Sequence, residues 1–485
     1  MSYSLQEAFK SKDTAPPYHV FQCLDDYFVF DTSGCRFYQI NELSYHFLKL
    51  LQNFPTNEVE SMLISDGYPE ALVTETSKGI LLIGDQGLFD VPDFTITDVQ
   101  LEDWLANMEG IRHWSIDLML TEKCNLACKY CFCATSRDVP SGIMDEATIK
   151  KAIDMLFGTA KKNADVDINF FGGEPLLNKK GFRYAIEYSR KLADETGRKI
   201  SYRMTTNGTI LDDEILELLL KHKIPVMISL DGPENIHDLQ CPTHYGGGSY
   251  HTVAGNIRRL LELQHPVEVR CTLAHPMPRL KELVEFFDGF SSFGFRRIVI
   301  APVQNPFYNP TPLDFQVEDY DALAQESREL LPWIIEKLRQ CDSPFRYFNF
   351  IHEVQGIFNG TFSQTVGAIR CSACPVVINV ATDGSLYPCC RFSGMKKWKT
   401  GDVESGPDYE SYKSFWRKYR KQVNKSCSNC WAFPICKGPC PWEIHTPDGN
   451  FTAPKNCDFL RSHVEDAAYV YAHMPQDATK TPINI

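Results

Sequence analysis

The sequence has no apolar run long enough to cross a bilayer, and it begins Met-Ser-Tyr-Ser-Leu-Gln-Glu, which does not read as a signal peptide. Low-complexity tracts are also missing, so the chain should be globular throughout. Basic residues are outnumbered: 49 Lys and Arg against 62 Asp and Glu give a net charge of −13. This charge argues against a general nucleic-acid surface without excluding a local basic groove. We expect a cytoplasmic protein whose partners include neither a membrane nor nucleic acid.

Cysteine, by contrast, is abundant, with 18 residues in a chain of 485. In a chain without an export signal, so many thiols indicate reduced cysteines that bind metal, and not disulfides. The chain is also too long for one ordinary core, so two to four domains are expected. The spacing of the cysteines is therefore the first guide to function.

Three of the cysteines, Cys124, Cys128 and Cys131, form a C-x3-C-x2-C array directly after an alternating apolar run at 115–120. Thiolates are the ligands of iron–sulfur clusters. Three of them can hold three irons of a cubane and leave the fourth iron open to a small molecule. Zinc knuckles and redox pairs also use close cysteines, so the spacing alone does not decide the metal.

A second motif, Phe-Phe-Gly-Gly-Glu-Pro at 170–175, follows the next expected strand. A cluster loop on one strand end and Gly-Gly-Glu-Pro on the next resemble radical S-adenosylmethionine (SAM) enzymes, and the chain is identified as a member of that superfamily. The resemblance implies a [4Fe–4S] cluster on the three cysteines of the array. It further implies that this cluster reduces SAM to a 5′-deoxyadenosyl radical, which takes hydrogen from an unactivated carbon.

From residue 115 onward, strands and helices alternate, which predicts a parallel sheet and an α/β fold. We expect strands at 115–120, 166–171, 199–205, 226–230, 267–273 and 297–301. Helices are expected near 145–157, 181–196, 212–222, 250–263 and 280–287. Six such units match the partial (β/α)6 barrel of the resembled superfamily. Ligands bind at the carboxyl ends of parallel strands, and both motifs fall there.

The resemblance also implies which residues contact SAM. It places an aromatic ring near the adenine, bare glycine backbone near the methionine amino group, and polar groups near the ribose and methionine ends. These contacts are assigned to Tyr130, Gly172, Gly173, Glu174, Thr206, Asn207, Ser229 and Asp231. The alternative for Asn207-Gly208 and Asp231-Gly232-Pro233 is that these residues only form turns.

One position departs from the resembled pattern. Where the family has His-Asp-x-x-Arg, this chain has His237-Asp-Leu-Gln-Cys241, so the arginine that often pairs with the SAM carboxylate is missing. We nominate Arg270, on the fifth expected strand, because an arginine in a buried strand needs an anionic partner. A structural ion pair with Glu268 or another acid is the alternative.

Cysteines gather again near the C-terminus, where C-x2-C-x5-C-x3-C-Pro and one later cysteine resemble the SPASM extension. That extension holds two further [4Fe–4S] clusters, although four-thiolate zinc sites use similar pairs. The resemblance assigns the first cluster to Cys371, Cys374, Cys389 and Cys440, and the second to Cys427, Cys430, Cys436 and Cys457. A hairpin at 382–389 should deliver Cys389. Cys390 stands where sulfatase maturases carry the aspartate that acts as their base. The replacement of this aspartate by cysteine disfavours the formylglycine reaction.

The first 95 residues carry no ligand pattern. Short strands, helices at 42–51 and 57–64, and a further hairpin at 81–89 resemble the winged-helix element that binds leader peptides, with an edge strand open to strand addition. A structural extension or a dimer contact is the alternative. The expected plan is a leader-recognition domain, the barrel, a helical bridge, the SPASM domain and a tail, at 1–95, 110–310, 311–365, 366–465 and 466–485.

This order of domains resembles thioether-forming peptide maturases. It implies a leader-bearing peptide or small protein as substrate, SAM and three [4Fe–4S] clusters as cofactors, and a flavodoxin- or ferredoxin-type electron donor. Oxidation of Cys or Ser to formylglycine, epimerisation and carbon–carbon cross-linking stay open as other reactions. An iron–sulfur electron carrier or scaffold is the non-enzymatic alternative, and the acidic charge disfavours RNA modification.

Overall fold

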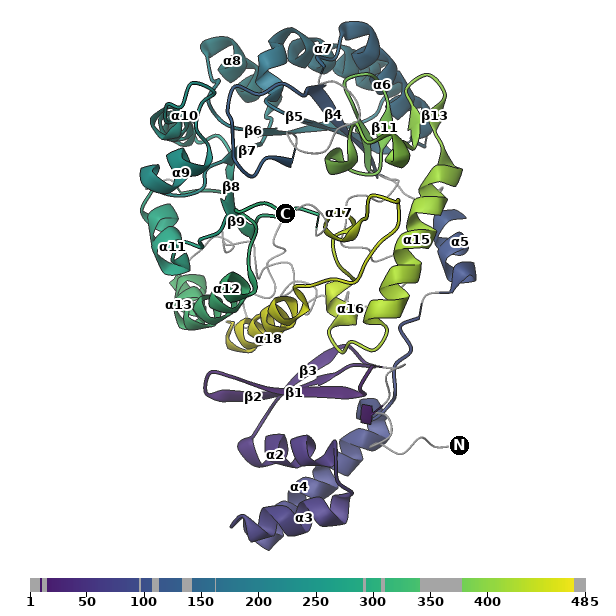
Figure 1. Ribbon diagram of the computed structural model, residues 1–485, viewed down its shortest axis with the longest axis vertical. Helices are drawn as coiled ribbons and strands as arrows, with labels where there is room; N and C mark the ends of the chain where they lie inside the picture. Colours follow the sequence, from purple (N-terminus) through teal and green to yellow (C-terminus); the bar gives the residue numbers. More distant parts are fainter. Residues whose placement is uncertain are drawn as a thin grey trace.

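The structure is a computed structural model that describes residues 9–10, 15–95, 97–106, 113–132, 142–161, 163–290, 294–306, 310–340 and 377–474. Figure 1 shows an N-terminal unit standing below a larger body, in which an arc of strands faces the C-terminal helices. Within the described ranges, no helix combines the length and apolar character needed to cross a membrane.

The N-terminal unit is a three-stranded antiparallel sheet followed by helices. The sheet has the order β1-β2-β3, with strands β1 (Tyr18–Cys23), β2 (Asp26–Asp31) and β3 (Arg36–Ile40). The helices are α2 (Glu42–Leu51), α3 (Thr56–Ser65) and α4 (Glu70–Ile83). Their apolar faces form one core, in which Phe47, Leu48 and Val59 are buried against Tyr18. The strands of this sheet therefore precede all three helices.

The hairpin expected at 81–89 is wrong. These residues are the end of α4 and a π-helical turn, η1 (Gly84–Leu88). Val73, Ser77 and Ile80 recur every three to four residues and are buried, which is the spacing of an amphipathic helix. The paired glycines suggested a hairpin turn, but only Gly87 takes a positive φ, of 109°.

The main sheet has eight strands in the order β11-β10-β4-β5-β6-β7-β8-β9. Its central strands are β4 (His113–Thr121), β5 (Asp165–Gly172), β6 (Ile200–Thr206), β7 (Val226–Ser229), β8 (Val267–Leu273) and β9 (Arg297–Pro302). Each pairs in parallel with the next along the chain. The predicted α/β fold with a parallel barrel sheet is therefore confirmed.

Helices follow the strands on the outside of the arc (Figure 1). They are α6 (Glu146–Thr159), α7 (Lys179–Thr196), α8 (Asp213–His222), α9 (Glu234–Gln240), α10 (Tyr250–Glu262) and α11 (Leu280–Gly289). Ile116 and Leu118 of β4 and Ile168 of β5 are fully buried in the core beneath these helices. Because side chains alternate along a strand, Asp117 and Asn169 belong to the opposite, inner face.

A hairpin from the C-terminal part of the chain extends the sheet. Strand β10 (Val377–Val380) pairs in parallel with β4, with Asn379 in register with Asp117, and β11 (Leu386–Tyr387) closes the edge. The hairpin predicted near 382–389 is thus confirmed. Its pairing with the barrel was not foreseen, because a separate C-terminal domain was expected from 366 onward.

The remaining helices lie opposite the arc and around its open side. They are α5 (Asp98–Ala106), α12 (Val317–Glu329), α13 (Leu331–Gln340), α15 (Tyr409–Cys427), α16 (Phe433–Cys436), α17 (Pro441–Ile444) and α18 (Cys457–His473). An aromatic core holds α15 in place, with Trp416, Phe415 and Tyr419 buried on one of its faces. Two of the C-terminal cysteines lie at ends of long helices, Cys427 at the end of α15 and Cys457 at the start of α18.

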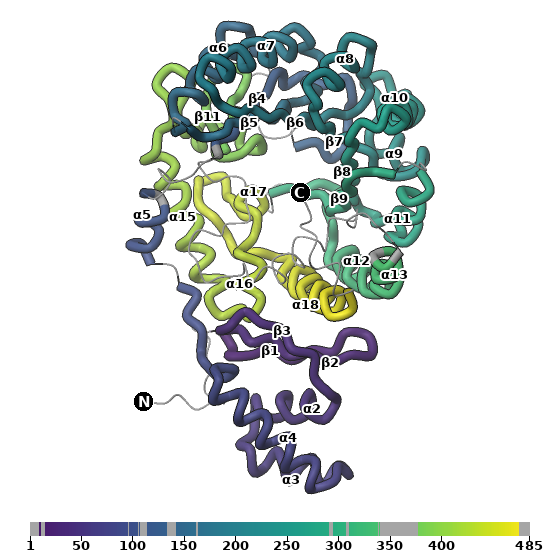
Figure 2. The backbone as a smooth tube through the Cα atoms, turned by 180° about the vertical axis from the view of Figure 1, so that it is seen from behind, coloured from purple at the N-terminus to yellow at the C-terminus, as the bar shows by residue number. Residues whose placement is uncertain are grey.

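The N-terminal unit rests on the C-terminal segment, as the view from behind also shows (Figure 2). The His19 ring stacks on Trp431 with a centroid separation of 3.8 Å, and His19 Nε2 lies 2.9 Å from Glu465 Oε1. Phe30 packs in the same cluster as Trp431 and Ile435. The first domain thus contacts the loop and helix that carry the last cysteines.

Candidate active site

The loop after β4 carries Cys124, Cys128 and Cys131, all three partly exposed. Backbone bonds fix it against the segment after α9: Ala127 N donates to Pro242 O at 2.8 Å, and Lys129 N donates to Gln240 O at 3.0 Å. The three thiols are therefore held on one braced loop at the carboxyl end of the first barrel strand.

The environment of Cys124 fits a cluster ligand. Its sulfur accepts hydrogen bonds from Leu126 N at 3.4 Å and from Asn207 Nδ2 at 3.6 Å. Burial raises the pKa of the free Cys124 thiol to about 11, and these donors partly offset that shift. Hydrogen bonds to the sulfurs are one of the means by which proteins adjust iron–sulfur clusters. The donor set therefore suits iron bound through thiolates.

The two glycines of the second motif allow a close approach of two loops. A Cβ on Gly172 would lie 2.2 Å from Thr121 O, and one on Gly173 would lie 2.3 Å from Lys123 O. Gly173 N donates to Thr121 O at 2.8 Å. From the sequence, these two glycines were assigned only to SAM binding. In the structure they lie against the backbone of Thr121 and Lys123, where the loop with the three cysteines begins.

Glu174 is fully buried and joins two strand ends. Its carboxylate accepts hydrogen bonds from Leu176 N at 3.0 Å, Asn207 N at 2.7 Å and Thr206 Oγ1 at 2.9 Å. Burial raises the pKa of Glu174 to about 7. Glu174 thus fixes Asn207, whose side chain in turn reaches Cys124.

Tyr130 is tied to the ends of β7 and β8 through Asp231. The Tyr130 hydroxyl donates to Asp231 Oδ2 at 2.6 Å, and Thr272 N donates to Asp231 Oδ1 at 2.9 Å. Asp231 is 1% exposed, and burial raises its pKa. The structure thus places both carboxylate oxygens of Asp231 in contacts within the protein.

Cys241, at the position of the missing arginine, belongs to this same network. Its sulfur lies 3.2 Å from the Tyr130 hydroxyl and 3.5 Å from Asp231 Oδ2. Asp231, His237 and Cys241 could together offer metal ligands, since their donor atoms lie within 4.8 Å of one another. His237 Nδ1, however, accepts from Asp231 N, and His237 Nε2 lies 3.1 Å from the Ser249 hydroxyl. We therefore assign the group a structural role.

Arg270 and Ser229 stand side by side in register at the ends of β8 and β7. The proposed structural pair between Arg270 and Glu268 is not formed, because Glu268 Oε2 binds Arg297 at 2.5 Å. Burial lowers the pKa of Arg270, and the charge of Arg391 lowers it further. Among the residues that the structure describes, no carboxylate lies within 4.0 Å of the Arg270 guanidinium. This cation is thus available to an anionic ligand.

Four C-terminal cysteines converge. Cys427, Cys430, Cys436 and Cys457 all line one pocket at the end of α15. Arg461 from α18 lines it too; burial lowers the pKa of Arg461, but its hydrogen bond to Cys430 and the nearby charges raise it overall. Four thiols around a single pocket are the ligand set of a closed cubane or a zinc site.

Only some of the cysteines assigned to the other proposed cluster lie in the described part of the chain. Burial lowers the pKa of Arg391, but the charges of the Cys440 and Cys389 sulfurs and other nearby groups raise it overall. Both thiols therefore lie near the Arg391 guanidinium. Cys389 Sγ and Cys390 Sγ are 4.0 Å apart. Cys371 and Cys374 lie outside the described residues, which leave out positions 341–376. The ligand set of this cluster stays a prediction.

A model of the radical SAM superfamily matches residues 118–288. The chain contains a radical SAM domain. A cysteine-type anaerobic sulfatase-maturating enzyme of Clostridium perfringens is 26% identical over 336 residues, which covers 65% of this chain and 85% of that enzyme.

Two solved structures share the fold of this radical SAM protein. The structure of native anSMEcpe with bound AdoMet and Kp18Cys peptide has a TM-score of 0.63 and 22% identity, covering 76% of this chain and all of that one. Streptococcus suis SuiB bound to precursor peptide SuiA has a TM-score of 0.51 and 14% identity, covering 92% of this chain and 99% of that one.

The radical SAM domain implies bound SAM and a [4Fe–4S] cluster, for which Cys124, Cys128 and Cys131 are the fitting thiols. Sequence reasoning missed Asp117, on the inner face of β4, whose Oδ1 accepts from Asn169 Nδ2 at 2.8 Å. An acid inside an otherwise apolar strand, Trp-Ser-Ile-Asp-Leu-Met-Leu, was the available signal.

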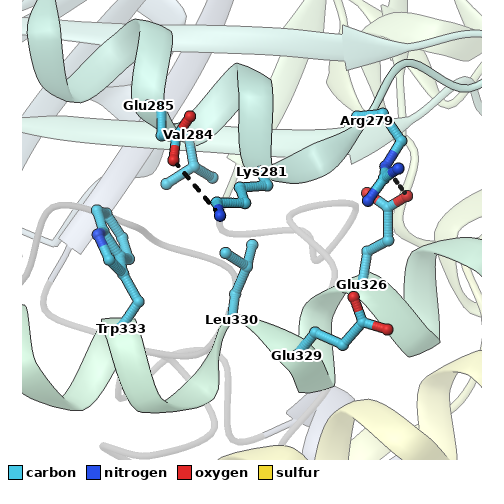
Figure 3. Close-up of a pocket in the computed structure, with 8 residues that line it drawn as sticks. All are labelled: Arg279, Lys281, Val284, Glu285, Glu326, Glu329, Leu330 and Trp333. Carbon is cyan, nitrogen blue, oxygen red and sulfur yellow. Dashed lines mark ion pairs between the residues drawn. The ribbon is translucent and has the colours of Figure 1, made fainter.

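A separate hollow lies between α11 and the helices α12 and α13, away from these cysteines (Figure 3). Two ion pairs lie in its lining: Arg279 Nε lies 2.7 Å from Glu326 Oε1, and Lys281 Nζ lies 3.9 Å from Glu285 Oε1. Because no thiol lies among the lining residues that the structure describes, this hollow is not the radical site.

Proposed function

We propose that this radical SAM enzyme modifies a peptide or small protein after translation. The observation that carries the proposal is the arrangement at the carboxyl ends of β4 to β6, where Asn207 Nδ2 donates to Cys124 Sγ and Gly173 packs against the backbone of Lys123. The relative from Clostridium perfringens is named for maturing a sulfatase, and both solved structures named above contain a peptide. These names support a polypeptide substrate.

When bound, the [4Fe–4S] cluster and SAM supply the electron and the 5′-deoxyadenosyl radical that removes a hydrogen atom from the substrate. The chain's own residues orient these groups. Glu174 fixes Asn207 beside Cys124, and Asp231 fixes the ring between the second and third cysteines, Tyr130. Ordered side chains of this kind keep the reacting atoms in place and exclude water.

We propose the SAM contacts on the basis of the same geometry. We assign its amino group to the backbone of Gly172 to Glu174, and its carboxylate to Arg270, which has an open guanidinium. Ser229 stands beside Arg270 and is partly exposed. Asp231 is better assigned to holding Tyr130 than to contacting SAM directly, because its oxygens are engaged.

The reaction that we favour is closure of a thioether between a substrate cysteine and a carbon of the same peptide. Two features support it over formylglycine formation. Cys390 stands where a sulfatase maturase would carry its basic aspartate. The second feature is the added N-terminal unit: the anSMEcpe structure is matched over its whole length yet covers 76% of this chain, whereas SuiB with its precursor peptide covers 92%.

The N-terminal unit is proposed to bind the leader of the substrate. Its outer strand β3 pairs only with β2 among the described strands, so the other edge of β3 can accept an added strand. The two auxiliary clusters, on the C-terminal cysteines, would then accept the electron left on the substrate or ligate a substrate thiolate.

Oxidation of Cys or Ser to formylglycine is the second candidate, because the sequence relative named above is a maturase of this kind. Both reactions can be tested by anaerobic reconstitution with SAM, reductant and short peptides encoded beside the gene, read by tandem mass spectrometry. A thioether removes two hydrogens and blocks the thiol to alkylation. Formylglycine made from cysteine replaces sulfur by oxygen, and formylglycine made from serine removes two hydrogens without involving a thiol. No deoxyadenosine release with any peptide would overturn the proposed function.

A further inference from the structure

Two acidic residues lie on the inner face of the arc of strands, Asp117 on β4 and Asp167 on β5 (Figure 1). The second of them has its hydrogen bonds satisfied within the protein. The Asp167 carboxylate accepts from Ser115 Oγ at 2.9 Å and from Ser201 Oγ at 2.8 Å. It also pairs with Arg203 Nη2 at 2.6 Å and is 4% exposed. Asp167 therefore has a structural role.

Asp117 is not satisfied in this way. Its Oδ1 accepts from Asn169 Nδ2 at 2.8 Å, while its Oδ2 accepts no hydrogen bond from any residue that the structure describes. Its strand neighbours Ile116 and Leu118 are fully buried, whereas Asp117 is partly exposed. Because alternate residues of a strand face opposite sides of the sheet, this exposure is to the space inside the barrel. One carboxylate oxygen is thus open to a molecule that enters the barrel.

The position of Asp117 along β4 puts it below the radical site. Thr121, where the loop with the three cysteines begins, follows Asp117 by four residues. An even separation keeps two strand residues on the same face of the sheet. A peptide that fills the barrel beneath this loop therefore passes the Asp117 carboxylate.

The turn after β11 approaches Asp117 from the C-terminal part of the chain. Ser393 Oγ donates to Asn379 Oδ1, and Asn379 is in register with Asp117. The hydrogen bond with Cys389, burial and the charge of Asp117 all raise the pKa of Cys390, so the Asp117 carboxylate lies near this thiol. Asp117 is thus close to the turn that carries Cys389, a thiol assigned to the first auxiliary cluster.

Closure of a thioether has to release a proton. The substrate thiol carries a hydrogen that the 5′-deoxyadenosyl radical does not take, and sulfur reacts best as the thiolate. Glu174 and Asp231 are poor candidates for the base, because both carboxylates already accept hydrogen bonds at each oxygen. Burial raises the pKa of Asp117, although the Asn169 hydrogen bond opposes the shift. A raised pKa makes a carboxylate a stronger base at neutral pH.

We propose that Asp117 is the base that accepts the proton of the substrate thiol as the thioether closes. This proposal rests on the proposed function. Asp117 Oδ2 takes the thiol proton, the 5′-deoxyadenosyl radical takes a hydrogen atom from the substrate carbon, and the sulfur bonds to that carbon. The one surplus electron passes to an auxiliary iron–sulfur cluster. Each cross-link therefore removes two hydrogens from the peptide.

The test uses the reconstituted full chain and the peptide that the wild type cross-links. Asp117→Asn keeps the size of the side chain and can still accept from Asn169, but it cannot take a proton. Asp167→Asn is the matched control, because it removes an acid of the same interior whose carboxylate is already bonded. A second peptide carries selenocysteine in place of the cross-linked cysteine, since a selenol is ionised at neutral pH and needs no base. Iron content and circular dichroism verify folding.

We expect Asp117→Asn to close the thioether of the cysteine peptide about 100-fold or more slowly than the wild type. Release of 5′-deoxyadenosine should fall much less, because cleavage of SAM does not involve the thiol proton. With the selenocysteine peptide, Asp117→Asn should approach the rate of the wild type on that peptide. Asp167→Asn should cross-link either peptide at nearly the wild-type rate.

Unchanged closure of the cysteine thioether in Asp117→Asn would overturn the proposal. An equally large loss with the selenocysteine peptide would also overturn it and assign Asp117 to positioning of the substrate. An equal loss in Asp167→Asn would assign both acids to the structure of the barrel. Failure of the wild type to cross-link any peptide would instead reject the proposed function.

Discussion

Cys124 receives two N–H donors, and its replacement tests the radical site at the scale of one residue. Cys124→Ala removes one of three thiols that share a single cluster, so we expect release of 5′-deoxyadenosine from SAM to fall below detection. The measurement is chromatography of the anaerobic reaction, together with iron analysis. Cys241→Ser is the control, since Cys241 lies beside the same loop but is not proposed as a ligand. Retained cleavage in Cys124→Ala would reject the assignment.

Glu174 gives a pH-dependent prediction. Its folded pKa of about 7 lies above the value of about 4.3 expected in the unfolded chain. The folded state therefore keeps the Glu174 proton to a higher pH than the unfolded state does. Protonated Glu174 favours the folded state, and this contribution is lost as the pH rises through 7. Its contribution to the free energy of unfolding should fall by about 3 kcal/mol as the pH rises from about 4.3 to 7.

Glu174→Gln lacks this titration, so the stability difference between wild type and variant should shrink over that pH range. Urea denaturation of the metal-free protein at several pH values measures it. Glu217→Gln, at an exposed position on α8, controls for the loss of one carboxyl group. A difference that stays constant with pH would show that the Glu174 carboxyl does not titrate in this way.

At the residue scale, spacing alone could predict the thiols, because ligands close in sequence must lie on one loop. The partners of Tyr130, Asp231 and Cys241 could not be predicted, since they depend on which strand ends meet. The same holds for Arg270, whose expected alternative partner Glu268 turned out to bind Arg297.

The packing of the loop after β5 against the loop after β4 can be tested at the scale of elements. Gly173→Ala would place a methyl group 2.3 Å from Lys123 O, in contact with backbone that cannot turn aside. We expect a loss of about 1–3 kcal/mol of stability and less iron bound at the first site.

Gly158→Ala is the matched control, because a Cβ at this position of α6 meets no atom within 4 Å. There the substitution should stabilise the helix by roughly 0.5–1 kcal/mol. Thermal unfolding and iron analysis of both variants give the comparison. Equal stability of the two alanine variants would contradict the tight contact.

The strands and helices of the barrel were predictable because each buries an apolar face. Apolar residues recur every second residue in a strand and every three to four residues in a helix. The hairpin expected at 81–89 failed because its glycines were weighed above the helical spacing that precedes them. The addition of β10 to the barrel sheet could not be foreseen. It joins Asn379 to Asp117 across more than half of the chain, and sequence periodicity does not report which strands pair.

For the whole molecule, the N-terminal unit sits on the C-terminal cysteine segment, and its Phe21, Cys23 and Phe28 join the buried cluster that contains the barrel core. The sequence predicted that such a unit exists, but its seat on Trp431 and Glu465 depends on surface complementarity alone. A substrate bound to β3 would therefore be tethered to the part of the protein that carries the pocket of Cys427, Cys430, Cys436 and Cys457.

Deletion of residues 1–95 tests this tether. We expect the affinity for a leader-bearing peptide to fall about tenfold or more. SAM cleavage with dithionite should continue, because the deletion removes only Phe21, Cys23 and Phe28 from the buried cluster that contains the barrel core. Fluorescence anisotropy of labelled peptide measures the binding. The deletion also uncovers Trp431 and Ile435, so His19→Ala serves as the control. That variant loses the ring stacking and the Glu465 contact but retains β3, and it should bind peptide nearly as well as the wild type. Unchanged affinity in the truncated protein would place the leader site elsewhere, in the barrel or along the C-terminal helices.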